Sequence, residues 1–231
     1  KDGAEDANHN GKRDVATETD PNLADTDADG MKDGWEVKYS GPTGQGPPLN
    51  PLKDDAKADN DGDKLSNLQE YQQTWVIGGK LQSASTHPRD KDSDDDGLDD
   101  FQEVNATYPG TPSFPTGSNP NSKDTDGDGL PDGLEDGDSN GKSDKGETSP
   151  KRSDSDGDGL SDGEEDANHN GKVDNDGKGK GETDPNDPDS DDDTLNDGEE
   201  VQLLGTNPLL KDTDGDGLGD SVEVGKAGDL D

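Results

Sequence analysis

The chain has 231 residues, of which 19% are hydrophobic and 3% aromatic, and its formal net charge at pH 7 is −39. Ordinary globular domains contain roughly 45–50% apolar residues, so this chain cannot offset the entropy cost of folding by burying an apolar core. The acidic excess excludes nucleic acid and anionic membranes as partners, because phosphates require clustered Lys and Arg; the absence of Cys excludes disulfides, and no apolar run is long enough for direct membrane insertion.

A twelve-residue segment recurs seven times along the chain and opens with three alternating Asp residues. Its first copy, Asp25–Glu36, reads D-T-D-A-D-G-M-K-D-G-W-E. Two copies lack the Gly at position 6 and carry Lys64 or Thr194 there. The other six copies span residues 59–70, 92–103, 124–135, 154–165, 189–200 and 212–223.

A second, Asn-rich segment brings the number of acidic loops to ten. It reads D-x-N-x-N-G-K-x-D and begins at Asp6 and Asp166. A related segment, D-G-D-S-N-G-K-S-D, begins at Asp136.

The spacing of these carboxylates fits calcium, which takes six to eight oxygen ligands at about 2.3–2.6 Å. Side chains at positions 1, 3 and 5 converge when the chain curls around an ion. Gly at position 6 permits the turn, position 7 offers its carbonyl, position 9 acts directly or through water, and Glu at position 12 closes the shell. Magnesium prefers tighter octahedral sites, and zinc and copper prefer His or Cys. Disordered acidic low complexity would require neither the Glu at position 12 nor the apolar residue at position 7.

The predicted cofactor is therefore Ca²⁺ at about ten sites. The first loops should be built by Asp6, Asn8, Asn10, Lys12 and Asp14; Asp25, Asp27, Asp29, Met31, Asp33 and Glu36; Asp59, Asp61, Asp63, Leu65, Asn67 and Glu70; and Asp92, Asp94, Asp96, Leu98, Asp100 and Glu103. The middle loops should be built by Asp124, Asp126, Asp128, Leu130, Asp132 and Glu135; Asp136, Asp138, Asn140, Lys142, Asp144 and Glu147; and Asp154, Asp156, Asp158, Leu160, Asp162 and Glu165. The last loops should be built by Asp166, Asn168, Asn170, Lys172 and Asp174; Asp189, Asp191, Asp193, Leu195, Asp197 and Glu200; and Asp212, Asp214, Asp216, Leu218, Asp220 and Glu223.

The affinities of the ten sites are expected to differ. Loops with five carboxylates should bind calcium more tightly than Asn-rich loops, because ligand charge tunes affinity. The loops with Lys64 and Thr194 should bend less readily, because they lack the Gly that the turn favours.

The linkers between loops have a signature of their own. A Pro lies four residues before six of the loops, and a Thr or Ser lies two residues before each Pro, which predicts a stiff approach to the next site. These pairs are Thr19 and Pro21, Thr86 and Pro88, Ser118 and Pro120, Thr148 and Pro150, Thr183 and Pro185, and Thr206 and Pro208.

Apolar residues follow position 12 in most of the simple loops, and they predict a single helical turn there whose apolar side covers the neighbouring loop. These residues are Val37, Tyr71, Val104, Val201 and Val224. Two Pro-rich insertions, Gly41–Pro51 and Tyr108–Pro120, should pack onto the array rather than offer a partner surface. A third insertion, Trp75–Leu81, is the most apolar run and predicts a short strand.

The array resembles the thrombospondin type 3 repeat in its bacterial, cysteine-free form, as in D-S-D-G-D-G-L-S-D-G-E-E at Asp154. Neither EF-hands nor dockerins fit. Glu135 is followed at once by Asp136, which leaves no room for an entering helix, and a dockerin would have only two loops. The resemblance implies an elongated, irregular repeat fold with short helical turns and little regular secondary structure, in which metal ions take the place of an apolar core.

Four regions are predicted along the chain. Residues 1–24 hold a truncated loop and an Asn-rich loop, and 25–123 hold three calcium loops with long Pro-rich or apolar insertions. Residues 124–188 hold two tandem double-loop repeats, and 189–231 hold two single-loop repeats that are truncated at the C-terminus. We expect the chain to be a segment of a longer array.

No Ser/His or Cys/His arrangement is present and the carboxylates are in register for metal, so we expect no enzymatic activity. The leading hypothesis is a bacterial extracellular or cell-surface stalk, spacer or fibre made rigid by calcium, in contact with neighbouring copies or flanking surface domains; a periplasmic location fits as well. The alternative is a calcium-dependent adhesion module that binds a protein or glycan through Trp75 or Phe114.

Overall fold

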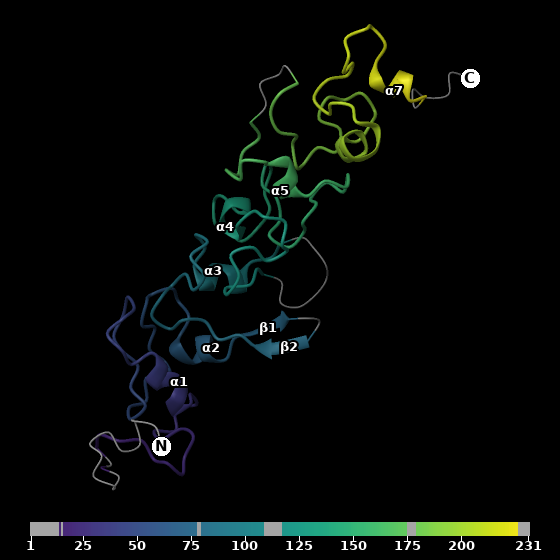
Figure 1. Cartoon of the computed structure of the whole chain (residues 1–231). Coiled ribbons are helices and arrows are strands. Elements are labelled where there is room, and N and C mark those ends of the chain that lie inside the picture. The colour runs from purple at the N-terminus through teal and green to yellow at the C-terminus, as the bar shows by residue number, and fades with distance from the viewer. Residues whose placement is uncertain (1–13, 15, 78–79, 109–116, 175–178, 226–231) are drawn as a thin grey trace. The chain divides into compact units, whose positions relative to one another are not determined.

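The computed structural model describes residues 14, 16–77, 80–108, 117–174 and 179–225. Short helical turns and one hairpin are separated by long irregular segments (Figure 1), which confirms the predicted irregular repeat fold. The helical elements are α1 (Asp33–Lys38), α2 (Asn67–Tyr71), α3 (Asp100–Asn105), α4 (Asp132–Glu135), α5 (Asp162–Glu165), α6 (Asp197–Glu199), the π-helix η1 (Glu200–Leu204) and α7 (Asp220–Glu223). The strands are β1 (Thr74–Ile77) and β2 (Lys80–Ser83).

The chain divides into two compact units. One is built mainly from the residues up to Val104 and the other mainly from those after Asn121. The boundaries of the four predicted regions stay predictions.

Each of the seven α-helical turns begins at position 9 of a loop, not after position 12 as predicted. The residue before it is extended, as an N-cap should be, and Ser66 and Ser161 form capping boxes with Gln69 and Glu164. The backbone N–H of position 9 also reaches back to the carbonyl of the residue that precedes the loop, as from Asp162 to Ser153 at 3.1 Å. The helical turn therefore closes the loop and places the position 12 Glu within it or directly after it.

The apolar residue at position 7 is the one that is covered by protein. Its exposed fraction is 0% in Met31, Leu98 and Leu195, and it is at most 7% in Leu65, Leu130 and Leu160. In the 212–223 loop the equivalent Leu218 is 53% exposed.

The residue after position 12 does not have the predicted covering role in three loops. Val37, Val201 and Val224 are all exposed, because the turn starts at position 9 and so aims position 13 away from the loop. The buried apolar residue of the loop is therefore position 7, six residues before the predicted position 13.

Three pairs of successive simple loops are joined by a hydrogen bond from the helical turn of one loop to a carboxylate of the simple loop before it. The donor is the backbone N–H of position 10, and the acceptor is Oδ2 of the preceding position 5 Asp. It joins Phe101 to Asp63 at 3.1 Å, Gly198 to Asp158 at 2.6 Å and Ser221 to Asp193 at 3.1 Å.

Gly198 and Gly163, at position 10 of their loops, lie especially close to the simple loop before them. A Cβ on Gly198 would lie 2.5 Å from the carbonyl oxygen of Asp158, and one on Gly163 would collide with the carbonyl of Asp128. Gly34 is at the same position of the 25–36 loop, and a Cβ there would meet no atom within 4 Å. At Gly198 and Gly163 the contact with the preceding simple loop, and not the loop itself, leaves no room for a side chain, whereas Phe101 and Ser221 donate the same bond with one.

The insertion that begins at Gly41 packs onto the array, as predicted. Leu49 and Ala56 are buried in a small cluster with Met31 and Tyr39, and Trp35, Leu68 and Tyr71 pack against it. The guanidinium of Arg89 donates to the carbonyls of Tyr39, Gly41 and Gly46 at 2.6–3.0 Å and so holds the start of the insertion. This cluster is a local apolar core within one unit.

The apolar segment at Trp75–Leu81 forms an antiparallel hairpin of β1 and β2, rather than the single strand predicted. Thr74 pairs with Ser83 and Trp75 with Gln82, and the hairpin projects from the loops of its unit (Figure 1). Of the Tyr108–Pro120 insertion, residues 109–116 lie outside the described part.

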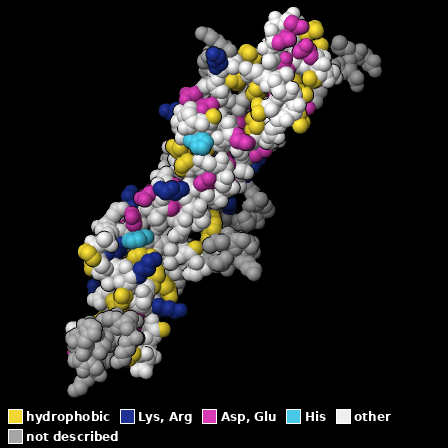
Figure 2. All heavy atoms as spheres, in the orientation of Figure 1, with side chains coloured by type: hydrophobic (Ala, Val, Ile, Leu, Met, Phe, Trp, Pro, Cys, Tyr) yellow, Lys and Arg dark blue, Asp and Glu magenta, His cyan; other side chains and the backbone are white. Residues whose placement is uncertain are grey.

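Hydrophobic side chains on the face shown in Figure 2 form small separate groups. Among the described residues, no helix has both the length and the apolar character needed to cross a membrane.

Candidate metal sites

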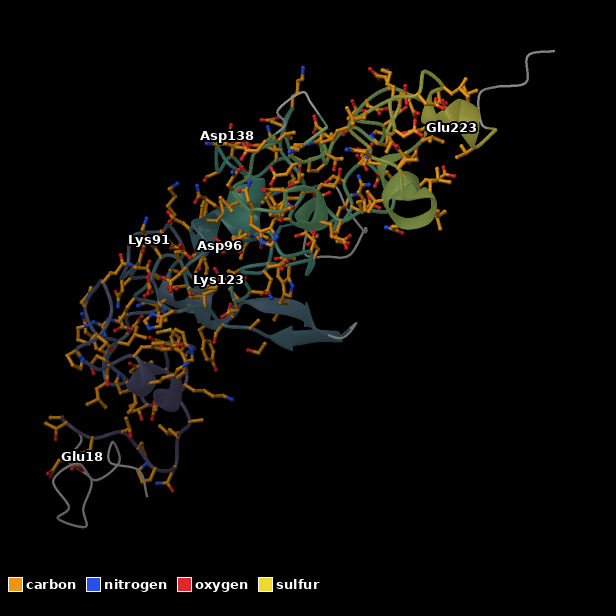
Figure 3. The ribbon with its side chains drawn as sticks, turned by 45° about the horizontal axis from the view of Figure 1, so that its top comes forward. Glu18, Lys91, Asp96, Lys123, Asp138 and Glu223 are labelled. Atoms are coloured by element: carbon orange, nitrogen blue, oxygen red, sulfur yellow. The ribbon has the colours of Figure 1, made fainter. Side chains whose placement is uncertain are left out.

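The Asp side chains at positions 1, 3 and 5 converge, as the spacing predicts. In the loops at 25–36, 59–70 and 92–103, one oxygen from each of the three carboxylates lies within 4.8 Å of the other two. Acidic side chains of this kind occur all along the ribbon, with Asp96, Asp138 and Glu223 in three different loops (Figure 3). Oxygens that share a calcium ion at about 2.3–2.6 Å lie at such separations.

Backbone N–H groups hold the three carboxylates in place. In the 124–135 loop, Asp124 accepts from the N–H groups of Gly127 and Gly129 at 2.6 and 3.0 Å. Asp126 accepts from position 5 at 3.3 Å, and Asp128 accepts from position 7 at 2.7 Å. The 154–165 and 212–223 loops repeat the pattern.

The turn places two residues, not one, in the left-handed region. Position 6 has a positive φ, as expected, and Lys64 and Thr194 adopt it without Gly, at +93° and +84°. Position 4 is also left-handed, with φ of +64° at Ala28 and +61° at Asp95. Such angles cost non-Gly residues about 1 kcal/mol or more, so the two Gly-lacking loops bend by accepting backbone strain.

The position 12 Glu lies against the three Asp residues and is deeply buried. Glu36, Glu70, Glu103 and Glu200 are 0% exposed and Glu135 is 2% exposed. Only Glu223, in the 212–223 loop, is exposed.

In three linker signatures the Thr binds this Glu. Its hydroxyl lies 3.3 Å from Glu70 in Thr86, 3.1 Å from Glu135 in Thr148 and 3.0 Å from Glu200 in Thr206. Partners behind a metal ligand typically orient it. The Thr-x-Pro signature therefore fixes the carboxylate of the preceding loop, in addition to stiffening the linker.

Many carboxylate oxygens in these clusters are buried without a hydrogen-bond donor. Both oxygens of Glu36, Glu165 and Asp191 are in this state, and so is Oδ2 of Asp126 and Asp156. Buried anions of this kind require a proton or a cation. The donor set, made only of oxygens and several-fold negative, fits calcium.

The electrostatics lead to the same conclusion. Burial, reinforced by Asp126 and Asp128, raises the pKa of Glu135 to about 11. Burial together with Asp61 and Asp63 raises the pKa of Glu70 to about 10. With no cation, the cluster would hold protons at neutral pH, so calcium binding would displace them.

The position 9 Asp is held within its own loop. Both oxygens accept from the position 2 residue, as when the N–H and hydroxyl of Ser155 donate to Asp162 at 2.7 Å each. Thr26 and Asp33 show the same pair. Direct or water-mediated ligation by position 9 stays a prediction, but its hydrogen bonds show a role in closing the loop.

The Asn-rich loops use their acidic groups differently. Asp136 accepts from the backbone of Gly141 and from the Tyr108 hydroxyl, each at 2.7 Å. Glu147 accepts the N–H groups of Asp138 and Asp144 at 3.1 and 3.0 Å. More donors reach these carboxylates than reach those of the simple loops, which is consistent with the weaker binding predicted for them.

Two residues of these loops escaped the sequence prediction. Glu182 accepts from the N–H groups of Asn168 and Asp174 at 3.0 Å each, and Glu18 accepts from Asp14 at 2.8 Å. Both correspond to Glu147, although Glu182 is farther from its loop in sequence. The signal was the E-T-x-P run that ends all three segments. The predicted ligands Asp6, Asn8, Asn10 and Lys12 lie outside the described residues.

Four segments of the chain match the bacterial TSP3 repeat family, at residues 25–41, 154–169, 189–211 and 212–225. No curated protein and no solved structure is significantly similar to the chain. Each matched segment begins at the first Asp of a predicted loop. These four segments are thus bacterial TSP3 repeats, a calcium-binding repeat family, and the resemblance is confirmed. The number of calcium sites and the individual ligands stay predictions.

Proposed function

We propose that the chain is a calcium-rigidified segment of an extracellular stalk, spacer or fibre on a bacterial surface, without enzymatic activity. The observation that carries the proposal is the shared role of the position 5 Asp. Asp158 belongs to the Asp group at the start of its loop, and its second oxygen accepts the Gly198 N–H of the next loop at 2.6 Å. An ion that fixes this carboxylate also fixes the contact between neighbouring loops.

Calcium concentrations outside cells suit such a role. Extracellular calcium modules typically bind at about 10⁻⁴–10⁻³ M, and in a chain with little apolar core the binding free energy is largely folding free energy. The chain would therefore remain expanded where calcium is scarce and become ordered after export.

The first experiment is circular dichroism with small-angle scattering, in excess calcium and then in a chelator. We expect the radius of gyration to increase and the ordered signal to vanish on chelation. An unchanged particle would contradict metal-dependent folding and with it the whole proposal.

A second experiment tests rigidity itself. Because the chain has no Cys, spin labels can be placed on Lys145→Cys and Leu203→Cys, two exposed positions of one unit. A stalk predicts a narrow distance distribution in calcium and a broad one in chelator. A broad distribution in both conditions would contradict the stalk.

The adhesion alternative receives less support. Trp75, one of its two predicted contact residues, is 8% exposed, and Phe114 lies outside the described residues. Retention of binding to a surface ligand by Trp75→Ala, with unchanged calcium uptake, would argue further against it.

A further inference from the structure

A second acidic cluster lies beside the Asp group of the 25–36 loop and includes a residue that belongs to no loop. One oxygen each from Asp29, Glu36 and Asp55 lies within 4.8 Å of the other two. Asp29 also belongs to the cluster with Asp25 and Asp27. Asp55 follows the Gly41–Pro51 insertion and lies four residues before the next loop.

We propose that Asp29, Glu36 and Asp55 bind an additional calcium ion, next to that of the 25–36 loop, which ties the insertion to the array. The inference rests on calcium binding by the repeats, as proposed above. It adds a ligand, Asp55, that the repeat pattern does not contain.

Buried oxygens without a hydrogen-bond donor occur on two residues of this cluster and on Asn67, which contacts Asp55. Glu36 is 0% exposed and neither of its oxygens has a hydrogen-bond donor. Oδ1 of Asp55 is buried without a donor, and so is Oδ1 of Asn67, itself 0% exposed. Four buried acceptors with no donor among them are what an oxygen-ligated cation requires.

The insertion holds Asp55 in a fixed position. Its Oδ2 accepts the N–H of Asn50 at 3.2 Å, and its own N–H donates to Oδ2 of Asp29 at 3.2 Å. The Nδ2 of Asn67 donates to the Asp55 carbonyl at 2.9 Å. Residue 56 is buried in the apolar cluster. Oδ1 of Asp55 is thus available to a ligand, and hydrogen bonds within the protein position the Asp55 side chain without that ligand.

The sequence of the following loop explains why Asp55 is needed. Position 9 of the other six simple loops is Asp, but here it is Asn67, and position 2 is Asn60 in place of Ser or Thr. The neutral amide brings one oxygen but no charge. Asp55 supplies the missing negative charge from outside the loop.

The test counts bound calcium in the full chain by equilibrium dialysis. Asp55→Asn keeps the size of the side chain and an oxygen for Asn50, and it should lose one ion relative to the wild type. The matched control is Asp54→Asn, which removes the same charge from an exposed neighbour and should lose none.

A local probe separates this site from the rest. In a Trp75→Phe background Trp35, next to Glu36, is the only Trp, so terbium emission sensitised by it reports on ions nearby. We expect Asp55→Asn to lower that emission and Asp54→Asn to preserve it. An Asp55→Asn variant with unchanged calcium count and emission would overturn the inference.

A loss of several ions would mean that Asp55→Asn disturbs the unit. The double variant Asp55→Asn/Asn67→Asp then decides, because it restores one carboxylate at the cluster. Recovery of the lost ions supports the site, and failure to recover them overturns it. Absence of calcium from the wild type would instead refute the proposed function.

Discussion

Replacing Gly198 by Ala tests whether contacts between neighbouring loops stabilise the array. The new Cβ would lie 2.5 Å from the carbonyl oxygen of Asp158, so the two loops must separate and the hydrogen bond to Asp158 is lost. A hydrogen bond to a charged group contributes about 1.5–3 kcal/mol, and overpacking costs about 1–3 kcal/mol. Ala gains about 1 kcal/mol over Gly in a helix.

The lower end of each range applies, because Asp158 is only half-buried. The net destabilisation of the turn at residues 197–204 is then about 1.5 kcal/mol. In saturating calcium, hydrogen exchange of these amides should become about 12-fold faster. Gly34→Ala is the matched control, since a Cβ there meets no atom within 4 Å, and exchange around it should be unchanged or slower. Equal responses of the two variants would refute the reasoning.

Three further predictions concern the metal sites. Thr148→Val removes the hydroxyl that binds Glu135 and should weaken calcium binding about 10-fold in a calorimetric titration. Thr148→Ser keeps the hydroxyl and should bind calcium as the wild type does. Equal affinities of the two variants would show that the contact does not orient the Glu135 carboxylate. Lys64→Gly relieves a φ of +93° and should stabilise the calcium-bound chain by about 1 kcal/mol in urea unfolding, while Gly97→Ala, at +109°, should destabilise it; the opposite order would contradict the strain. Burial raises the pKa of Glu70 to about 10, so without metal the folded state binds more protons than the unfolded state between the ordinary Glu pKa and that value. Metal-free stability is therefore greatest in acid and falls as pH rises towards 10, and scattering in chelator should show contraction from pH 7 to pH 4; a constant radius would count against this.

The loop itself was predictable from sequence because each of its parts is local. The alternating Asp residues, the turn at position 6 and the apolar residue at position 7 all act within twelve residues, and six of the seven position 7 residues are buried. The start of the helical turn was misplaced because the apolar residue at position 13 suggested a helix there, whereas the extended N-cap at position 8 starts it earlier.

What the sequence did not reveal depends on contacts between segments. The Thr of the linker was noted, but its bond to the Glu of the preceding loop spans 16 residues from Glu70 to Thr86. Asp55 belongs to no repeat motif, and only its proximity to Glu36 in the structure identifies it as a candidate ligand. Such partners require knowledge of how one repeat lies on the next.

The hydrogen bond between loops also gives the array a polarity. Three position 5 Asp residues accept from the simple loop that follows, as Asp63 does from Phe101, so each of these loops depends on a C-terminal neighbour for one partner of its own ligand. In an array with nearest-neighbour coupling, damage to one loop should therefore weaken ion binding mainly in the loop before it. Unzipping under load would then have a preferred direction, and the two ends of such a segment would not be mechanically equivalent.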